Sequence, residues 1–234
     1  MLQGIPSIMT ARGAGGSTLL SGLQVYYKLE DLTDSSGGAL TLTNNNGVTF
    51  VAGKVNNAAH FTDTSTQFLS HVDATGYQPG TGDWSISAWF NLTSGKTSNC
   101  LLEYGKVAAT HAAGYNLRTS NTNILGTISD GTNLAFKINT ATINDGAWHF
   151  VIVTFARGGN MSMYIDNAAA QTASIAAVTG SVNDNSAVGL TIGKDDSGDY
   201  WDNLIDEVGM WNRVLTSTEI STLWNSGNGT TYPF

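Results

Sequence analysis

From Leu23 onward the chain is a succession of short apolar segments separated by clusters of Gly, Asn, Asp and Ser. In the segment 84–92, apolar side chains occupy every second position, whereas serine and asparagine fill most positions between them. This alternation is typical of a strand with one buried face, because successive side chains of a strand point to opposite sides of the sheet. Trp89 is the exception and makes the second face partly apolar. The pattern predicts strands within 23–29, 48–53, 57–62, 67–72, 84–92, 99–105, 115–120, 124–129, 134–139, 148–156, 161–167, 190–194 and 205–211.

Many short strands at regular spacing, with no helical pattern between them, are typical of an antiparallel sandwich or jelly roll. The segment 149–156 is apolar on both faces. It therefore fits a central strand that is covered on both sides, or one that faces another subunit or an arm. We expect an all-β fold, and the 234 residues suit a single domain, since β domains commonly reach roughly 200 to 250 residues.

One short helix is expected near the C-terminal end, at roughly 217–225. Thr216 can cap its first turn, and Glu219 three positions later can reach back to complete a capping box. Gly227 supplies the stop. We expect this helix to close an open end of the fold and to play no part in chemistry. The hydrophobic staple and the apolar face of the helix comprise Leu215, Ile220, Leu223 and Trp224.

Residues 1–22 differ from the rest of the chain, being rich in Gly, Ser and Thr around the segment RGAGGS. We expect an extended N-terminal arm or linker there, followed by one folded domain over 23–234. No basic stretch leads into a sustained apolar run, so no secretory signal is expected. No segment approaches the roughly 20 apolar residues of a membrane span.

Composition narrows the choice of partner. Only 12% of the residues are charged, and the net charge of −8 comes without any Lys/Arg-rich stretch. Nucleic acid is therefore not expected as a partner, because phosphates are neutralised by such residues. The single cysteine, Cys100, excludes an internal disulfide and a cysteine-based zinc site. Its apolar neighbours favour a small buried side chain over a reactive thiol.

Several motifs occur in a characteristic order: VYYKLEDLTDSSGG, NNAAHFTDTSTQFLS, DWSISAWFNL, DGAWHFVIVTFARGGNMSMYIDN, LTIGK and IDEVGMWNRVLTSTEISTLWNSG. Together they resemble the laminin G-like branch of the concanavalin A-like lectin/glucanase superfamily, over nearly all of 23–229. The resemblance implies a two-sheet antiparallel jelly roll that serves binding or structure more often than catalysis. Phe150 stands where the family usually has a second histidine after His149. The family often has Asp and Gly directly after the Phe of the second hairpin, whereas here Thr62 separates Phe61 from Asp63. No family role is carried over to either position.

No catalytic set emerges from the sequence. Glycosidases of the superfamily place two carboxylates across the scissile bond, but the chain has only four glutamates and none lies in a Glu-x-Asp-x-Glu strand. The four histidines have no HExxH or HxH spacing, and the chain has neither a serine elbow nor a Walker loop. We therefore expect a protein that is not an enzyme, with His149 packed and hydrogen-bonded in a strand.

The remaining acidic residues indicate one structural calcium ion. Calcium takes about six to eight oxygen ligands, and the loop EDLTDSSGG at 30–38 offers carboxylates and carbonyls in close succession. The resemblance implies that the ion lies between this loop and an aspartate of the last strand. The alternative is an ordinary turn, with the aspartate bonded to backbone amides. The candidate ligands are Glu30, Asp34, Gly37 and Asp206.

The segment KDDSGDYWDN, at 194–203, combines aspartates with two aromatic residues. Its glycine precedes the third acid, so the spacing misses the EF-hand pattern, and a solvated hairpin is expected there instead of a second calcium site. Tyr200 and Trp201 are candidate ligand-binding residues, because aromatic faces suit the apolar faces of sugar rings. For Trp201, core packing is the preferred interpretation.

Two functions fit these expectations. The first is a surface protein of a bacteriophage virion, that is, a head decoration, fibre or tail adhesion subunit. It would dock onto capsid or tail proteins through the arm 1–22 and form a homo-oligomer. The arm, the weakly charged surface and the lack of an export signal motivate it, since a phage protein leaves the cell by lysis. The alternative is a secreted bacterial carbohydrate-binding or adhesion module. Both functions are compatible with binding of cell-surface glycans.

Overall fold

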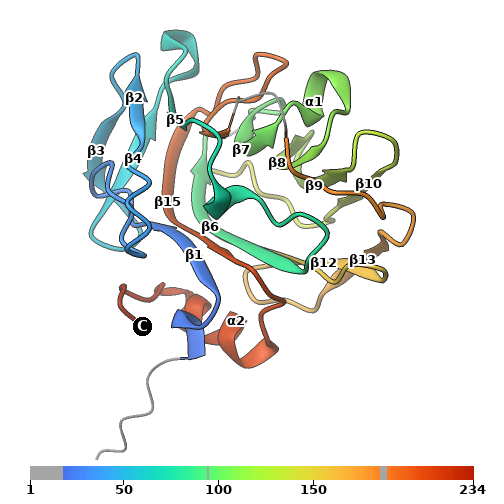
Figure 1. The fold of residues 1–234 in the computed structure, drawn as a ribbon. Coiled ribbons are helices and arrows are strands. Elements are labelled where there is room, and N and C mark those ends of the chain that lie inside the picture. Colours follow the sequence, from blue (N-terminus) through green and yellow to red (C-terminus); the bar gives the residue numbers. More distant parts are fainter. Residues whose placement is uncertain (1–17, 94, 185–188) are drawn as a thin grey trace, which may run out of the picture.

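The computed structural model describes residues 18–93, 95–184 and 189–234. Two antiparallel sheets pack face to face as a sandwich (Figure 1), which confirms the expected all-β fold. Sheet A runs in the order β13-β12-β11-β6-β15-β4-β3, and β1 also pairs with β15. It consists of β1 (Leu23–Tyr27), β3 (Thr49–Ala52), β4 (Asn57–Phe61), β6 (Trp84–Leu92), β11 (Trp148–Phe155), β12 (Asn160–Ile165), β13 (Gln171–Ser174) and β15 (Asn203–Trp211).

Sheet B runs in the order β10-β9-β8-β7-β14-β5-β2. Its strands are β2 (Thr43–Asn45), β5 (Phe68–His71), β7 (Cys100–Gly105), β8 (Gly114–Ser120), β9 (Asn123–Ser129), β10 (Leu134–Ile138) and β14 (Leu190–Ile192). Every strand expected from the sequence is present. The additional strands β2 and β13 are short and read TNN and QTAS, residue types with no strong apolar alternation.

Helical segments are few. In the described ranges they are α1 (Val107–Thr110), α2 (Ser217–Trp224) and the 3₁₀ turns η1 (Thr18–Leu20), η2 (Asp63–Ser65), η3 (Thr75–Tyr77) and η4 (Asn225–Gly227). α2 begins with the expected capping box, in which Thr216 and Glu219 satisfy each other's backbone donors. None of these helices has the length and apolarity that a bilayer span requires.

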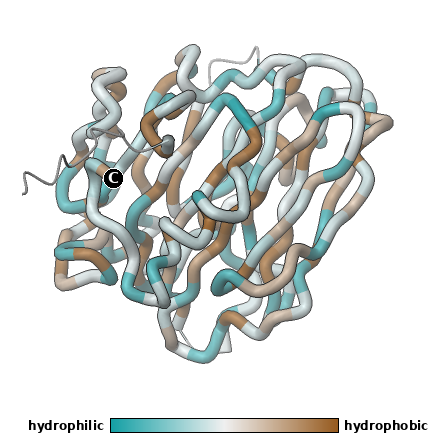
Figure 2. Tube along the Cα trace, turned by 90° about the horizontal axis from the view of Figure 1, so that it is seen from below, coloured by the Kyte–Doolittle hydropathy of each residue, from teal (hydrophilic) through white to brown (hydrophobic). Residues whose placement is uncertain are grey.

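The main core fills the space between the two sheets. β6 shows its origin: Trp84, Ile86 and Phe90 point inward, as the alternation predicts, and Ser85 and Ser87 lie on the other face. Hydropathy alternates along the strands in the same way (Figure 2). Trp84 stacks on the ring of Phe155 across the β6–β11 pair, with centroids 4.2 Å apart.

A second apolar cluster covers the outer face of sheet A. Trp89, Phe150 and Ile152 project outward from β6 and β11, and α2 packs on them. The ring of Trp89 stacks on Trp224 of α2 with centroids 5.1 Å apart. The prediction that 149–156 is covered on both sides is thus confirmed. The expectation that the helix closes an open end was wrong, because its apolar face finds a larger apolar partner on the sheet surface.

Residues 18–22, expected to be part of the arm, belong to the packed domain. Leu19 is buried in the second cluster, and its carbonyl accepts a hydrogen bond from Trp211 Nε1 at 2.7 Å. Arg213 holds the same segment by donating from Nε to the Ser21 carbonyl at 2.7 Å and from Nη2 to the Thr18 carbonyl at 2.8 Å. The remainder of the expected arm, 1–17, lies outside the described residues.

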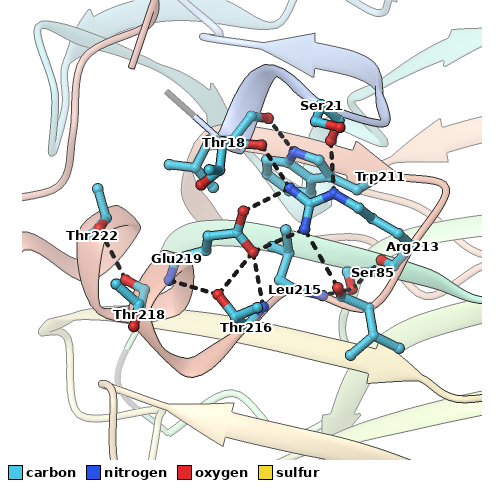
Figure 3. Close-up of polar contacts among 12 residues, drawn as sticks. Thr18, Ser21, Ser85, Trp211, Arg213, Leu215, Thr216, Thr218, Glu219 and Thr222 are labelled. Atoms are coloured by element: carbon cyan, nitrogen blue, oxygen red, sulfur yellow. Dashed lines mark hydrogen bonds and ion pairs between the residues drawn. The ribbon is translucent and has the colours of Figure 1, made fainter. Parts of the chain in front are cut away.

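Arg213 also joins this segment to α2 (Figure 3). Its Nη1 and Nη2 each donate to one carboxylate oxygen of Glu219 at 2.8 Å. This bidentate pair is the main reason why the pKa of Glu219 falls from 4.5 to about 2. One guanidinium thereby ties the N-terminal turn, the end of β15 and the start of α2 together.

Cys100 and His149, two side chains capable of chemistry, have structural roles. Cys100 is buried in β7, and burial raises the pKa of its thiol. His149 lies in β11, where Nδ1 pairs with Asp166 at 2.7 Å and Nε2 with Asp145 at 3.2 Å. Both sequence-based expectations are confirmed.

We predict that Arg213→Leu lowers the free energy of unfolding by roughly 2 kcal/mol at neutral pH, because it strands the nearly buried carboxylate of Glu219. The loss should shrink as the pH falls from about 4.5 toward about 2, since the lowered pKa of Glu219 makes its contribution disappear when it is protonated. Denaturant unfolding across this pH range measures both effects. Lys28→Leu, which removes a more exposed ion pair with Glu30, should cost less than about 1 kcal/mol. Equal losses of unfolding free energy in the two variants would contradict the stabilising role of the Arg213–Glu219 ion pair.

Candidate functional site

The predicted calcium ligands are engaged by N–H donors. Both oxygens of Glu30 are used, Oε2 by Lys28 Nζ at 2.9 Å and Oε1 by Asn56 Nδ2 at 2.7 Å. Asp34 accepts from the backbone N–H groups of Tyr26, Ser36 and Leu40 at 3.2, 2.9 and 3.4 Å. Asp34 therefore shapes the turn that follows β1.

Asp206 lies at an irregularity of β15, where its pairing with β6 shifts register. Its Oδ2 accepts from the backbone N–H groups of Lys54 and Val55, both at 2.9 Å. Burial raises the pKa of Asp206 to about 7 in spite of these donors. Gly37, the fourth candidate, has a φ of 93° in the turn after Asp34, a conformation that glycine adopts without strain.

These positions match the alternative expectation of a turn and of backbone-bonded aspartates. Among the residues that the structure describes, no three His, Cys, Asp or Glu side chains form a group that could hold a metal ion. Oδ1 of Asp206 is the one oxygen of the Glu30, Asp34 and Asp206 carboxylates that has no hydrogen-bond partner among the described residues, and it is buried. The calcium ion stays a prediction, which melting curves with calcium and with a chelator would test.

The two aromatic candidates differ in exposure. Trp201 is fully buried, donates from Nε1 to the Asn91 carbonyl at 3.2 Å and meets Phe90 edge-on. Burial removes it from the candidate sugar-stacking residues, and core packing is what the structure shows. Tyr200 is half-buried beside a polar hollow of about 270 Å³. Lys194 lies over its ring, 5.6 Å from the centroid, so this aromatic face already has a partner.

A second, larger hollow lies on the outer face of sheet B. This groove, of about 320 Å³, runs over β8, β9 and β10 and is bounded by α1. Strand register fixes its floor as two cross-strand rows. The first row is Arg118, Leu125 and Ile138, and the second is Asn116, Thr127 and Phe136.

One wall of the groove is apolar and exposed. Leu134, Phe136 and Ile138 alternate along β10 and are 37%, 55% and 39% exposed, whereas Ala135 packs on the main core. The sequence predicts which of these residues share a face. It did not reveal the groove, because the larger apolar side chains of a strand are normally assigned to the interior.

The opposite wall is polar and incompletely bonded. Asn116 is only 1% exposed, and its Nδ2 donates to Glu103 at 3.2 Å while its Oδ1 has no hydrogen-bond partner. Arg118 Nε is likewise buried without a partner. Buried polar atoms of this kind are rare in native proteins and call for an explanation.

Glu103 on β7 fixes the segments that border the groove. Its carboxylate accepts from the backbone N–H groups of Ala108 in α1 at 2.8 Å and of Asp196 at 2.7 Å. Asp196 in turn accepts from the N–H of Ala109 at 2.8 Å. Burial raises the pKa of Glu103 to about 8 although these donors favour its charged form.

Comparison with known proteins identifies relatives of the whole fold. A family model described as the concanavalin A-like lectin/glucanases superfamily matches residues 63–221. No curated protein sequence gives a significant match. Among solved structures, the binding domain of Paraclostridial Mosquitocidal Protein 1 is similar with a TM-score of 0.74 at 15% identity, over 89% of this chain and 53% of that one.

Two further structures are similar at the same 15% identity. Domain 4 of AbnA, an extracellular arabinanase from Geobacillus stearothermophilus solved with arabinotriose, gives a TM-score of 0.67 over 90% of this chain and 99% of that one. The binding domain of botulinum neurotoxin DC, solved with SialylT, gives 0.65 over 89% and 52%. The chain thus spans about half the length of the two toxin domains. At this identity the likeness shows the fold.

We predict that Glu103→Gln flattens the dependence of stability on pH. A carboxyl group whose pKa rises from 4.5 to about 8 on folding stabilises the native state fully below about 4.5, and this contribution is lost as the pH rises to about 8. Unfolding free energies at about pH 5 and about pH 9 should differ less in the variant than in the native protein. Identical pH dependences would show that Glu103 does not titrate in this way.

Proposed function

Because the chain belongs to the concanavalin A-like lectin/glucanases superfamily, we propose that it is a non-catalytic carbohydrate-binding module that holds a glycan in the groove over β8, β9 and β10. The observation that carries this proposal is that one wall of the groove is apolar and the opposite wall is polar. Phe136 and Ile138 offer apolar surface, whereas Asn116 and Arg118 offer unused hydrogen-bonding groups. A sugar ring has the same two-sided chemistry, with apolar C–H faces and polar hydroxyls at its edge.

The width of the groove supports a single ring. Two inter-strand spacings, about 10 Å, separate the polar side chains on β8 from the apolar side chains on β10. Leu125 and Thr127 of β9 form the floor between them. Two of the similar structures were solved with arabinotriose and with SialylT, and we extend the general role of glycan recognition to this chain.

The chemistry of the groove supports binding without turnover. Glycoside hydrolysis requires two carboxyl groups across the scissile bond. Of the described residues that line the groove, none is Asp or Glu. Glu103 lies beside Asn116 on the neighbouring strand β7, and its carboxylate accepts hydrogen bonds from α1 and from the backbone of Asp196.

The setting in which the module works stays a prediction. Display on a bacteriophage virion, with capsid or tail proteins as partners of the N-terminal arm and self-association of the chain, remains our first proposal for its location, and secretion remains the alternative. The weakly charged surface supports the virion setting. Cosedimentation with phage particles, compared between the full chain and a chain lacking residues 1–17, would separate the two.

We predict that Phe136→Ala weakens glycan binding about tenfold or more, because it removes the most exposed part of the apolar wall. The measurement is a glycan array that includes arabinotriose, followed by calorimetric titration of the strongest ligand. Val72→Ala is the matched control, since Val72 is 70% exposed and lies outside the groove. Retention of full affinity in Phe136→Ala, or failure of the native protein to bind any arrayed glycan, would contradict the proposal.

A further inference from the structure

We infer that the glycan bound in this groove carries a carboxylate and that Arg118 binds it. The inference rests on the proposed function and adds the chemical class of the ligand. Its starting point is the guanidinium of Arg118, which makes no hydrogen bond to any residue that the structure describes, although one of its nitrogens, Nε, is buried. A guanidinium presents five N–H donors in a planar fork.

The only acid paired with Arg118 in the described chain cannot complete its hydrogen bonding. Oδ2 of Asp195 lies 3.9 Å from Nη1 of Arg118, beyond hydrogen-bond reach. Asp195 is held in place through its other oxygen, which accepts from the backbone N–H groups of Ser197 and Asp199, both at 3.0 Å. Oδ2 of Asp195 is buried without a hydrogen-bond partner, and the ion pair at 3.9 Å leaves the terminal N–H groups of Arg118 without an acceptor among the described residues.

Charge around the groove favours an anion on the open side of Arg118. The chain as a whole is acidic, with 18 Asp and Glu against 10 Lys and Arg, yet no described residue lining the groove is acidic. Glu103 is the cross-strand neighbour of Asn116 on β7, and its carboxylate accepts from the backbone N–H groups of Ala108 and Asp196. An incoming carboxylate thus faces a cation in the groove lining, whereas Asp195, Asp196 and Glu103 lie next to the groove and not in its lining.

The geometry selects a carboxylated sugar over other anions. Two coplanar oxygens match the two terminal nitrogens of Arg118, Nη1 and Nη2, which are not buried. The ring that carries this group would lie over Leu125 and Ile138 of the same row. A neighbouring hydroxyl would then lie over the adjacent row, which contains Asn116 and Thr127. Hexuronates and sialic acids both combine these three features.

Calorimetric titration with matched ligand pairs tests the inference and separates the two sources of carboxylate. The pairs are trigalacturonate against its carboxyl-reduced trimer, and 3′-sialyllactose against lactose. The native protein should bind the acidic member of at least one pair about tenfold or more tightly than its neutral counterpart. Arg118→Gln should abolish that preference, and Arg118→Lys should restore only part of it, because an ammonium keeps the charge without the fork.

Phe136→Ala is the informative control. It should weaken both members of a pair while leaving their ratio unchanged, since Phe136 contacts the ring and not the carboxylate. Equal binding of acidic and neutral members, an unchanged preference in Arg118→Gln, or array hits confined to glycans without a carboxylate would overturn the inference and leave the proposed function intact. Absence of binding to every arrayed glycan would instead overturn the proposed function itself.

Discussion

The organisation of the molecule depends on burial of both faces of sheet A. The inner face packs on sheet B, and the outer face carries Trp89, Phe150 and Ile152, which water would otherwise contact. α2 and the N-terminal turn therefore pack on this outer face, and Arg213 joins them by hydrogen bonds. In the described part of the chain, no comparable apolar cluster covers the outer face of β8, β9 and β10, and this face forms the groove. The asymmetry between the two sheets thus decides where a ligand can bind.

Most of the fold could be predicted from local sequence, and the reasons are physical. Alternation over 84–92 identifies a strand because side-chain direction in a strand repeats every two residues. The Thr216–Glu219 pair predicts the start of α2 because its hydrogen bonds are local. Neither signal contains long-range information. The surface on which α2 packs, and the packing of 18–22 against the end of β15, depend on residues distant in sequence and could not be read locally.

The candidate site was harder to predict for the same reason. Alternation shows that Leu134, Phe136 and Ile138 share a face, but only the packing of Ala135 reveals that this face points outward. For Trp201 the sequence favours core packing over sugar stacking, and the structure buries it. Arg118 stands out only when its lack of hydrogen bonds is visible in three dimensions. Of the two aromatic candidates from the sequence, only Tyr200 is near a hollow.

The packing of both chain ends determines how the module can be attached to a larger body. Tyr232 and Phe234 pack on Tyr26, beside Leu19 in the second cluster, so both ends of the described domain lie on the outer side of sheet A (Figure 1). The groove is on the outer side of sheet B, across the full thickness of the sandwich. A tether at either end of the described domain would therefore attach it through the outer side of sheet A. The groove over β8, β9 and β10 would be presented away from the support, whether that support is a particle or a neighbouring domain.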